Sequence, residues 1–312
     1  MILILSSAAD TTTDGVVDWL STYSASYFRL NADDITDRRF LWNIEEDFFT
    51  VGEAHIAFNE IRSVWYRKIH STHFSKLFHS LEAKSSSLLH YLHQEYLSII
   101  NGLCYRLENK NWLTHFQNAE LNKLHVLRLA RQFSIPIPQT TLVNSQNDIP
   151  TDVICKSAYD SMFIKEQQHI AFTMYTEKVD MDKLPTQFFP SLVQKQIKKK
   201  YEIRTFYLCG SFFSMAIFSQ ENKETEVDFR THHTARPNRT SPYTLPKIIS
   251  EKLDALLNAL GLNCASIDLI RATDNQYYFL EINPTGEFGK LSHQCNYNLH
   301  QHVATKLIEM DC

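Results

Sequence analysis

The stretch that decides the fold is Tyr277-Tyr278-Phe279-Leu280-Glu281-Ile282-Asn283, followed at once by Pro284-Thr285-Gly286. Its aromatic and branched residues predict a strand in which every second side chain points to the same face, so Glu281 and Asn283 point the same way. A second run, Ser-Ile-Asp-Leu-Ile at residues 266–270, lies upstream, with a turn predicted at Asp274-Asn275. Folding the two runs back antiparallel brings Asp268 beside Glu281 and Asn283.

These three side chains predict a metal site. Two carboxylates and an amide oxygen suit a hard cation such as Mg²⁺, which retains water ligands and also takes the phosphate oxygens of a substrate. Spacing alone leaves a second interpretation open, namely a solvated strand face closed by an Asn-Pro turn.

Composition restricts the function classes. The 312 residues suffice for two or three packed lobes, and 44% hydrophobic with 21% charged residues is typical of a globular protein. A formal net charge of −4 argues against broad binding of nucleic acid or membranes, although local basic patches remain possible. The opening Met-Ile-Leu-Ile-Leu lacks a basic leader and indicates the edge of a fold and not a signal peptide. No segment approaches the roughly 20 apolar residues that span a bilayer.

The six cysteines are scattered, with no Cys-x-x-Cys pair, which is the pattern of reduced thiols in a cytoplasmic protein. His232-His233 and His293-x-Cys295 lack the usual spacing of structural zinc ligands, so no zinc is expected.

Periodicity predicts an α/β (α+β) protein that opens with a strand and then a helix. Apolar spacing predicts helices over residues 14–22, 74–100, 119–133, 246–261 and 299–309, with Asn101-Gly102 ending the second. Strands are predicted over residues 2–5, 140–143, 153–156 and 191–197, with a solvated Lys198-Lys199-Lys200 turn after the last of these. A hairpin of residues 201–208 and 212–218 turns at Cys209-Gly210.

Three cations precede the acidic hairpin on predicted strands. Lys156 ends an apolar run and could point at a phosphate, or could be an edge lysine that reaches solvent. Arg204, on a half-buried strand with Glu202, needs an anionic partner, either a phosphate or an ordinary salt bridge. Asp228-Phe229-Arg230 poses the same choice. In sequence order with the acidic residues, these cations describe a nucleoside triphosphate site and its metal.

At this point the sequence resembles the ATP-grasp ligases, and within them the branch that modifies ribosomal peptides, the microviridin-type and grasp-with-spasm maturases. The likeness covers nearly the whole chain. The segments that carry it are Ser63-Val64-Trp65-Tyr66-Arg67-Lys68, Asn122-Lys123-Leu124, Ile135-Pro136-Ile137-Pro138-Gln139-Thr140, Gln194-Lys195-Gln196-Ile197 with Tyr201-Glu202-Ile203-Arg204, Val227-Asp228-Phe229-Arg230, Ile267-Asp268-Leu269, and Glu281 through Phe288.

The resemblance implies an ATP-grasp fold with an N-terminal α/β pre-ATP-grasp domain, residues 1–115, and two lobes that clasp ATP, residues 116–190 and 191–312. It implies phosphate contacts from Lys123 and Lys156, and adenine recognition by the backbone of a hinge that includes Gln194, Lys195 and Ile197. Arg204 would stabilise the γ-phosphate and an acyl phosphate, and Glu202 and Arg230 would line the same cleft. Asp268, Glu281 and Asn283 would hold Mg²⁺.

One departure stands out. Many ATP-grasp enzymes close a glycine-rich loop over the phosphates after the second lysine, whereas residues 157–163 here contain no glycine. How a lid forms at this place does not follow from the sequence.

The implied activity is ATP- and Mg²⁺-dependent formation of ω-ester or ω-amide bonds between Asp or Glu and Thr, Ser or Lys side chains of a precursor peptide with a leader and a core. An acyl phosphate is the intermediate, and relatives suggest a homodimer. The leader could lie on residues 61–68 around Trp65, on the Gly210 hairpin or on the cluster Lys195 and Lys198 to Lys200, although a packed tryptophan explains Trp65 equally well. The alternatives are a ligase for free amino acids or peptide tails, and a non-catalytic ATP- or peptide-binding module.

Overall fold

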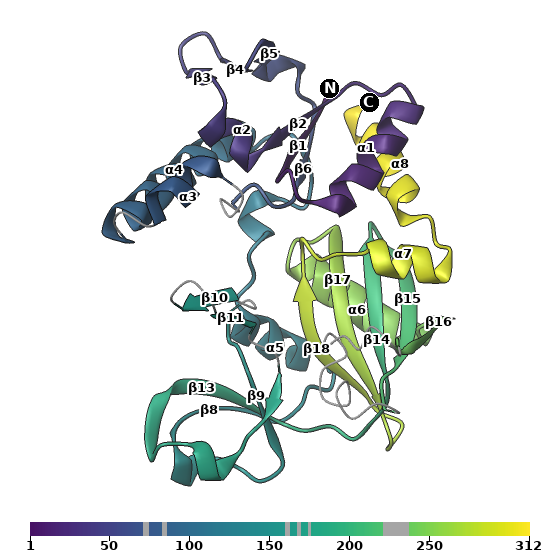
Figure 1. Ribbon diagram of the computed structural model, residues 1–312. Helices are drawn as coiled ribbons and strands as arrows, with labels where there is room; N and C mark the ends of the chain where they lie inside the picture. Colours follow the sequence, from purple (N-terminus) through teal and green to yellow (C-terminus); the bar gives the residue numbers. More distant parts are fainter. Residues whose placement is uncertain (71–74, 83–85, 160–162, 167–169, 174–175, 221–236) are drawn as a thin grey trace. The chain divides into compact units, whose positions relative to one another are not determined.

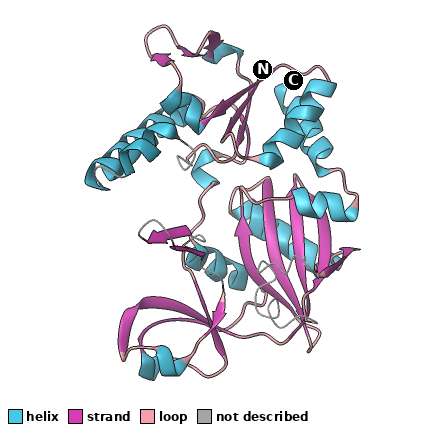
Figure 2. Cartoon of the chain, viewed as in Figure 1, coloured by secondary structure: helices cyan, strands magenta, loops and turns pink. Residues whose placement is uncertain are grey.

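The structure is a computed structural model that describes residues 1–70, 75–82, 86–159, 163–166, 170–173, 176–220 and 237–312 (Figure 1). It confirms the predicted α/β composition (Figure 2). The chain divides into two compact units, of which unit 1 comprises Met1–Glu120, Gly261–Ala265 and Pro284–Cys312, and unit 2 comprises Leu121–Leu260 and Ser266–Asn283. The three-part division at residues 115 and 190 stays a prediction.

Unit 1 is built on a parallel sheet of order β2-β1-β6-β7. The strands are β1 (Ile2–Ser6), β2 (Tyr27–Asn31), β6 (Ser63–Tyr66) and β7 (Asn111–Leu113). Every residue of β1 is buried, because a parallel sheet is covered on both faces. The strand predicted over residues 2–5 is confirmed and is buried; it lies between β2 and β6, inside the sheet and not at its edge.

Trp65 settles one alternative that the sequence left open. It lies in β6 with 1% of its surface exposed, and Tyr66 beside it is 2% exposed. A side chain this deep in the core contacts no peptide at the surface, so the packed-tryptophan interpretation is confirmed and the leader surface around Trp65 is ruled out.

Helices and a small second sheet complete unit 1. The antiparallel sheet consists of β3 (Phe40–Asn43), β4 (Phe48–Val51) and β5 (Ala54–Ala57), and short 3₁₀ turns cover Phe58–Glu60 and Phe116–Asn118. The helices are α1 (Thr11–Thr22), α2 (Ala32–Asp37), α3 (Lys76–Glu82), α4 (Ser86–Arg106), α7 (Gly289–Cys295) and α8 (Leu299–Asp311). Helix α1 packs against α8 through apolar residues one turn apart, such as Val16 and Leu20.

The predicted helix over residues 74–100 is two helices, α3 and α4, and the predicted stop at Asn101-Gly102 was wrong. Helix α4 continues to Arg106. A side chain at Gly102 would come within 3.4 Å of the Trp42 ring. This is an ordinary contact distance, so the position does not demand glycine, and Gly102 does not terminate the helix.

Unit 2 begins with α5 (Lys123–Gln132), shorter than the predicted helix over residues 119–133. The Asn122 side chain accepts the His125 amide hydrogen at 3.0 Å and so caps the helix at its start. A four-stranded sheet of order β12-β9-β13-β8 follows. Its strands are β8 (Thr140–Ser145), β9 (Val153–Lys156), β12 (Glu177–Lys178) and β13 (Gln187–Lys195). Strands β10 (Phe163–Glu166) and β11 (Ile170–Thr173) form a separate hairpin, and 3₁₀ turns cover Gln146–Asp148 and Met181–Lys183.

The second sheet of unit 2 has the order β16-β15-β14-β17-β18 and carries the candidate site. Its strands are β14 (Lys199–Leu208), β15 (Ser211–Phe218), β16 (Arg239–Tyr243), β17 (Cys264–Ala272) and β18 (Tyr277–Asn283). The predicted hairpin turn is confirmed, with positive φ at Cys209 and Gly210 as a two-residue turn of this kind requires. Helix α6 (Lys247–Ala259) lies along this sheet and buries Leu253, Leu256 and Leu257 (Figure 1).

None of the helices in the described parts of the chain is both long enough and apolar enough to cross a membrane.

Candidate nucleotide and metal site

The acidic hairpin forms as predicted. Strands β17 and β18 pair antiparallel, with Asp268 opposite Glu281 and Ser266 opposite Asn283. Directly opposed residues share a face of the sheet, and so do residues two apart on one strand. Asp268, Glu281 and Asn283 therefore lie together on one face, between the buried neighbours Ile267 and Ile282.

The hairpin also holds a feature that alternation does not predict. The register shifts between Asp268 and Leu269, because Leu269 pairs with Phe279 and not with Leu280. The extra residue is a β-bulge, and bulges re-aim side chains on the strand that carries them. The strict alternation expected over residues 277–283 is therefore interrupted just before Glu281. The turn at Asp274-Asn275 is confirmed, with Asn275 at φ 67°.

Two cations lie against the two carboxylates. Arg204 stands on β14, next to β17 in the sheet, and its Nη1 is 3.1 and 3.3 Å from the carboxylate oxygens of Asp268. Lys123, the first residue of α5, has its Nζ 3.5 Å from Glu281 Oε2. These four side chains are 13 to 25% exposed, so charge is concentrated where solvent and ligands still have access.

Lys123 also joins the hairpin to the strand that carries the second predicted lysine. Its Nζ donates to the backbone carbonyl of Ser157 at 3.0 Å. Ser157 directly follows Lys156, the half-buried last residue of β9. The structure thus places Lys123, Asp268, Glu281, Asn283 and Arg204 around one place, with the end of β9 reaching Lys123.

The predicted hinge is the end of β13 and the residues after it. Gln194 is 1% exposed, and its Nε2 donates to Thr140 Oγ1 at 2.9 Å. The amides of Lys195 and Gln196 already donate to Gln139 and Asp152 carbonyls. These two amides are therefore bound within the unit, and the adenine contact expected from Gln194, Lys195 and Ile197 stays a prediction.

Glu202 is buried, although a solvated turn was predicted just before it at residues 198–200. It is 5% exposed and is paired with Lys199, which is 7% exposed. The solvated turn expected at Lys198-Lys199-Lys200 was wrong at Lys199, because β14 begins there and a buried carboxylate holds the ammonium. The Ser219 hydroxyl also donates to Glu202, at 3.4 Å.

Among the residues that the structure describes, the buried acceptors Gln194 Oε1 and Glu202 Oε2 have no hydrogen-bond partner. An unsatisfied buried oxygen costs about 1–3 kcal/mol, so native proteins retain one where a ligand or water completes it. Both oxygens belong to residues that the family resemblance assigned to the nucleotide.

The donor set fits Mg²⁺. Within the described residues there is no group of three or more His, Cys, Asp or Glu side chains that could hold a metal, so the structure offers no zinc-like cluster there. Asp268, Glu281 and Asn283 instead provide two carboxylates and one amide, leaving room for phosphate and water oxygens, as Mg²⁺ prefers. Arg230, the remaining predicted residue, lies outside the described residues, as does Asp228.

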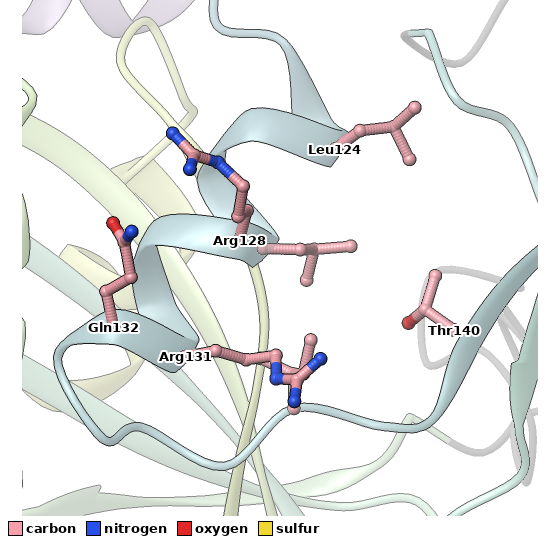
Figure 3. Close-up of a pocket in the computed structure, with 7 residues that line it drawn as sticks. Leu124, Arg128, Arg131, Gln132 and Thr140 are labelled. Atoms are coloured by element: carbon pink, nitrogen blue, oxygen red, sulfur yellow. The ribbon is translucent and has the colours of Figure 1, made fainter.

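The sequence did not reveal a pocket of about 460 Å³ beside α5. Figure 3 shows Leu124 and Arg131 extending on the side of the helix that faces Thr140. The pocket is lined by Leu124, Leu127, Arg128, Arg131, Gln132, Ile137 and Thr140. The signal was present in the amphipathic spacing of residues 124, 127, 128 and 131, but that spacing also fits a helix that is buried on one side.

Comparison with known proteins shows which proteins the chain resembles. Residues 1–120 match the family described as the MvdD pre-ATP grasp domain. The chain therefore has an ATP-grasp fold, and its first 120 residues resemble the MvdD pre-ATP-grasp domain. The predicted fold and the predicted resemblance to peptide-modifying ATP-grasp ligases are both confirmed. No curated protein sequence matches the chain.

Solved structures resemble this ATP-grasp chain over its whole length. The macrocyclase MdnC from Microcystis aeruginosa MRC, bound with precursor peptide MdnA, is 25% identical, with a TM-score of 0.84 over 99% of both chains. A RiPP-associated ATP-grasp ligase from Chryseobacterium gregarium, in complex with ADP and a leader and core peptide, is 23% identical, with a TM-score of 0.84 over 99% of this chain and 96% of that one. The ATP-grasp ligase PsnB, complexed with minimal precursor, Mg and ADP, is 14% identical, with a TM-score of 0.77 over 100% and 97%.

Proposed function

We propose that this chain is an ATP- and Mg²⁺-dependent ligase that forms ω-ester or ω-amide cross-links between side chains of a precursor peptide with a leader and a core. The observation that carries the proposal is the face of β17–β18, where two carboxylates, an amide and two cations gather. ADP, Mg and precursor peptides are bound by similar ATP-grasp ligases, which supports the same ligands here.

The charges at the site suit attack of a carboxylate on ATP. A peptide Asp or Glu oxygen would form a bond to the γ-phosphorus while the bond to the β,γ-bridging oxygen breaks, giving an acyl phosphate and ADP. Triphosphate and carboxylate repel each other, so catalysis depends on neutralisation and positioning. Mg²⁺ held by Asp268, Glu281 and Asn283 would supply much of that neutralisation.

The protein's own cations would do the rest. Arg204 would shift from Asp268 toward the transferring phosphoryl group, since a guanidinium binds phosphate oxygens in pairs. Lys123 and Lys156 would contact the other phosphates. A Thr or Ser hydroxyl or a Lys amine of the peptide would then attack the acyl carbon, releasing phosphate and closing an ester or amide ring.

The pocket beside α5 supports a peptide partner. Leu124 is 36% exposed there, and Arg131 adds positive charge to a lining that combines apolar Leu124, Leu127 and Ile137 with polar Gln132 and Thr140. Such a lining complements a peptide segment with apolar side chains next to acidic ones, and a peptide that supplies Asp or Glu to the ligase would carry acidic side chains. We assign this pocket to the precursor and the carboxylate face of β17–β18 to Mg²⁺ and ATP.

Mass spectrometry tests the proposal. A precursor peptide encoded next to this chain's gene is incubated with the protein, ATP and Mg²⁺. The proposal predicts loss of one water mass per ring and release of one phosphate per ring. Phosphate release with free amino acids and none with the peptide would instead identify a small-molecule ligase, and nucleotide binding with no product would identify a binding module.

A further inference from the structure

Arg67 is a buried charged side chain of unit 1. It belongs to one of the segments that carry the family resemblance, but the proposed nucleotide and metal sites give it no role. It follows β6 directly, and its side chain is 2% exposed. Its Nε donates to Asp10 Oδ2 at 3.0 Å, and its Nη2 to Asp10 Oδ1 at 3.3 Å. Its Nη1 donates to the backbone carbonyls of Thr285 and Gly286, at 2.8 and 3.3 Å.

The Asp10 carboxylate is itself held in place by hydrogen bonds. Its side chain is fully buried and accepts the hydroxyls of Thr13 and Ser6 at 2.7 and 3.1 Å. Burial alone would raise the pKa of the Asp10 carboxyl, but the charges of Arg67 and Lys68 and the hydrogen bonds bring that pKa well below its usual range. The carboxylate is therefore a fixed negative anchor for the guanidinium.

The segment that Arg67 holds begins one residue after Asn283. Its four residues are each held by side chains of unit 1. The Pro284 carbonyl accepts Thr114 Oγ1 at 3.5 Å. Arg67 bonds the next two carbonyls, and the Glu287 carboxylate is paired with Lys68 and hydrogen-bonded by Thr12.

The geometry requires an arginine. A guanidinium presents donors in a rigid planar fork, so one side of Arg67 can bind the carboxylate while another nitrogen reaches two carbonyls. The fork also lies over the Trp65 ring, 5.4 Å from its centroid. A lysine would keep the charge, but its single nitrogen cannot bind Asp10 and both carbonyls in this arrangement.

We propose that Arg67, oriented by Asp10, is a positioning residue for the metal site, because it fixes the turn that follows Asn283. Strand β18 ends at Asn283, whose backbone is set on one side by pairing with Ser266 and on the other by this turn. The two carbonyls that Arg67 binds lie only two and three residues after Asn283, so loss of these bonds would free the backbone that continues directly from the proposed metal ligand. The inference rests on the proposed function, in which Asn283 is a metal ligand.

Calorimetric titration of the full chain with ADP, in Mg²⁺ and separately in EDTA, tests this without turnover. The variants are Arg67→Lys, Asn283→Ala and their combination. Arg29→Lys is the matched control, because Arg29 also spreads its fork over a carboxylate, an amide and a carbonyl in unit 1, at Asp14, Asn31 and Ser7.

Arg67→Lys and Asn283→Ala are each expected to weaken ADP binding in Mg²⁺ about tenfold, the scale of a lost outer-shell contact. The combined variant should lose no more than Asn283→Ala alone, since both act on one ligand. Binding in EDTA should be unchanged, and Arg29→Lys should bind as wild type in both buffers. If Arg67→Lys does not fold, Asp10→Glu keeps the ion pair but displaces the fork, and should give the same Mg²⁺-specific loss.

The outcomes separate the two claims. An effect of Asn283→Ala with none from Arg67→Lys or Asp10→Glu overturns the positioning role and leaves the proposed function standing. Equal weakening in Mg²⁺ and EDTA also overturns it, because the change would then be general. If Asn283→Ala binds Mg²⁺ and ADP as wild type, the metal assignment falls, and the positioning role falls with it.

Discussion

The two arginine–aspartate pairs, Arg67–Asp10 in unit 1 and Arg204–Asp268 in unit 2, share their chemistry and differ in enclosure. The side chains of the first pair are 2 and 0% exposed, and those of the second are 20 and 13% exposed. Arg67 bonds a carboxylate and two carbonyls, whereas Arg204 meets its carboxylate through Nη1. The buried pair Arg67–Asp10, called here the closed pair, holds backbone in place. The partly exposed pair Arg204–Asp268, the open pair, lies next to a second carboxylate and can exchange partners with a ligand. Three variants test this difference, and a fourth tests the pocket beside α5.

The largest expected effect on catalysis is at Glu281, beside the open pair Arg204–Asp268. Glu281→Gln keeps the shape of the side chain and removes one negative charge from the face that would hold Mg²⁺. The kcat/KM of ring formation should fall about 100- to 1,000-fold, the scale of a lost electrostatic contact in a transition state. Thermal unfolding should change little, because Glu281 is half-buried at a strand end. Tyr278→Phe on the same strand is the control, and a Glu281→Gln variant with most of its activity would show that the metal assignment is wrong.

At the closed pair the main effect should be on stability. Asp10→Asn leaves Arg67 buried without its counter-charge, which should lower the free energy of unfolding by about 3–5 kcal/mol. Urea unfolding at neutral pH measures it, and Asp47→Asn, at the exposed pair with Arg106, should lose under about 1 kcal/mol.

The same pair predicts a pH dependence with a definite sign. The folded-state pKa of Asp10 lies below its unfolded value, so its stabilisation is complete above the unfolded pKa of about 3.9 and is lost as the pH falls toward the folded value. Asp10→Asn should remove that part of the acid sensitivity. Equal stability of the two proteins at neutral pH would contradict the closed-pair interpretation.

Arg204→Lys should reduce kcat about tenfold to 100-fold with a smaller change in the KM for ATP, because a lysine keeps the charge but loses paired contacts to the transferring phosphoryl group. Arg271→Lys, half-buried on β17 with its guanidinium over the Tyr277 ring, should leave both constants unchanged. If both variants gave the same rate, Arg204 would have no role beyond the surface charge of the sheet.

The smallest expected effect is at the α5 pocket. Arg131→Ala should weaken precursor binding several-fold and leave ADP binding unchanged, since one partly solvated charge contributes about 0.5–1 kcal/mol. Fluorescence anisotropy of a labelled precursor measures it, with Lys183→Ala, at a solvated pair elsewhere in unit 2, as the control. A loss of ADP affinity in Arg131→Ala would place the pocket in the nucleotide site instead.

Local patterns predicted the part of the site that lies on one hairpin. Alternation and a turn at Asp274-Asn275 were enough to bring Asp268, Glu281 and Asn283 to one face, because pairing of neighbouring strands follows from short-range geometry. Arg204 needed one further step, that a charged residue on a half-buried strand requires a counter-ion. The bulge before Glu281 could not be predicted, since nothing in the residues 277–283 distinguishes a bulged register from a regular one.

What the sequence could not predict are the specific partners of individual side chains, whether near or far along the chain. Lys199 was read as part of a solvated turn because its neighbours are lysines, and only the position of Glu202 on the same strand buries it. Gly102 was read as a helix stop, but α4 continues past it to Arg106. The bond from Arg67 to Thr285 and Gly286 spans more than 200 residues of sequence. No local pattern encodes it.

The most direct test of the account follows oxygen through the reaction. A precursor peptide labelled with oxygen-18 in its Asp and Glu carboxylates is incubated with the protein, ATP and Mg²⁺, and both phosphate and peptide are analysed by mass spectrometry. Carboxylate activation at the β17–β18 face predicts one labelled oxygen in each released phosphate and the loss of one labelled water mass from the peptide for each ring. Unlabelled phosphate, released while the peptide keeps its full mass, would contradict it.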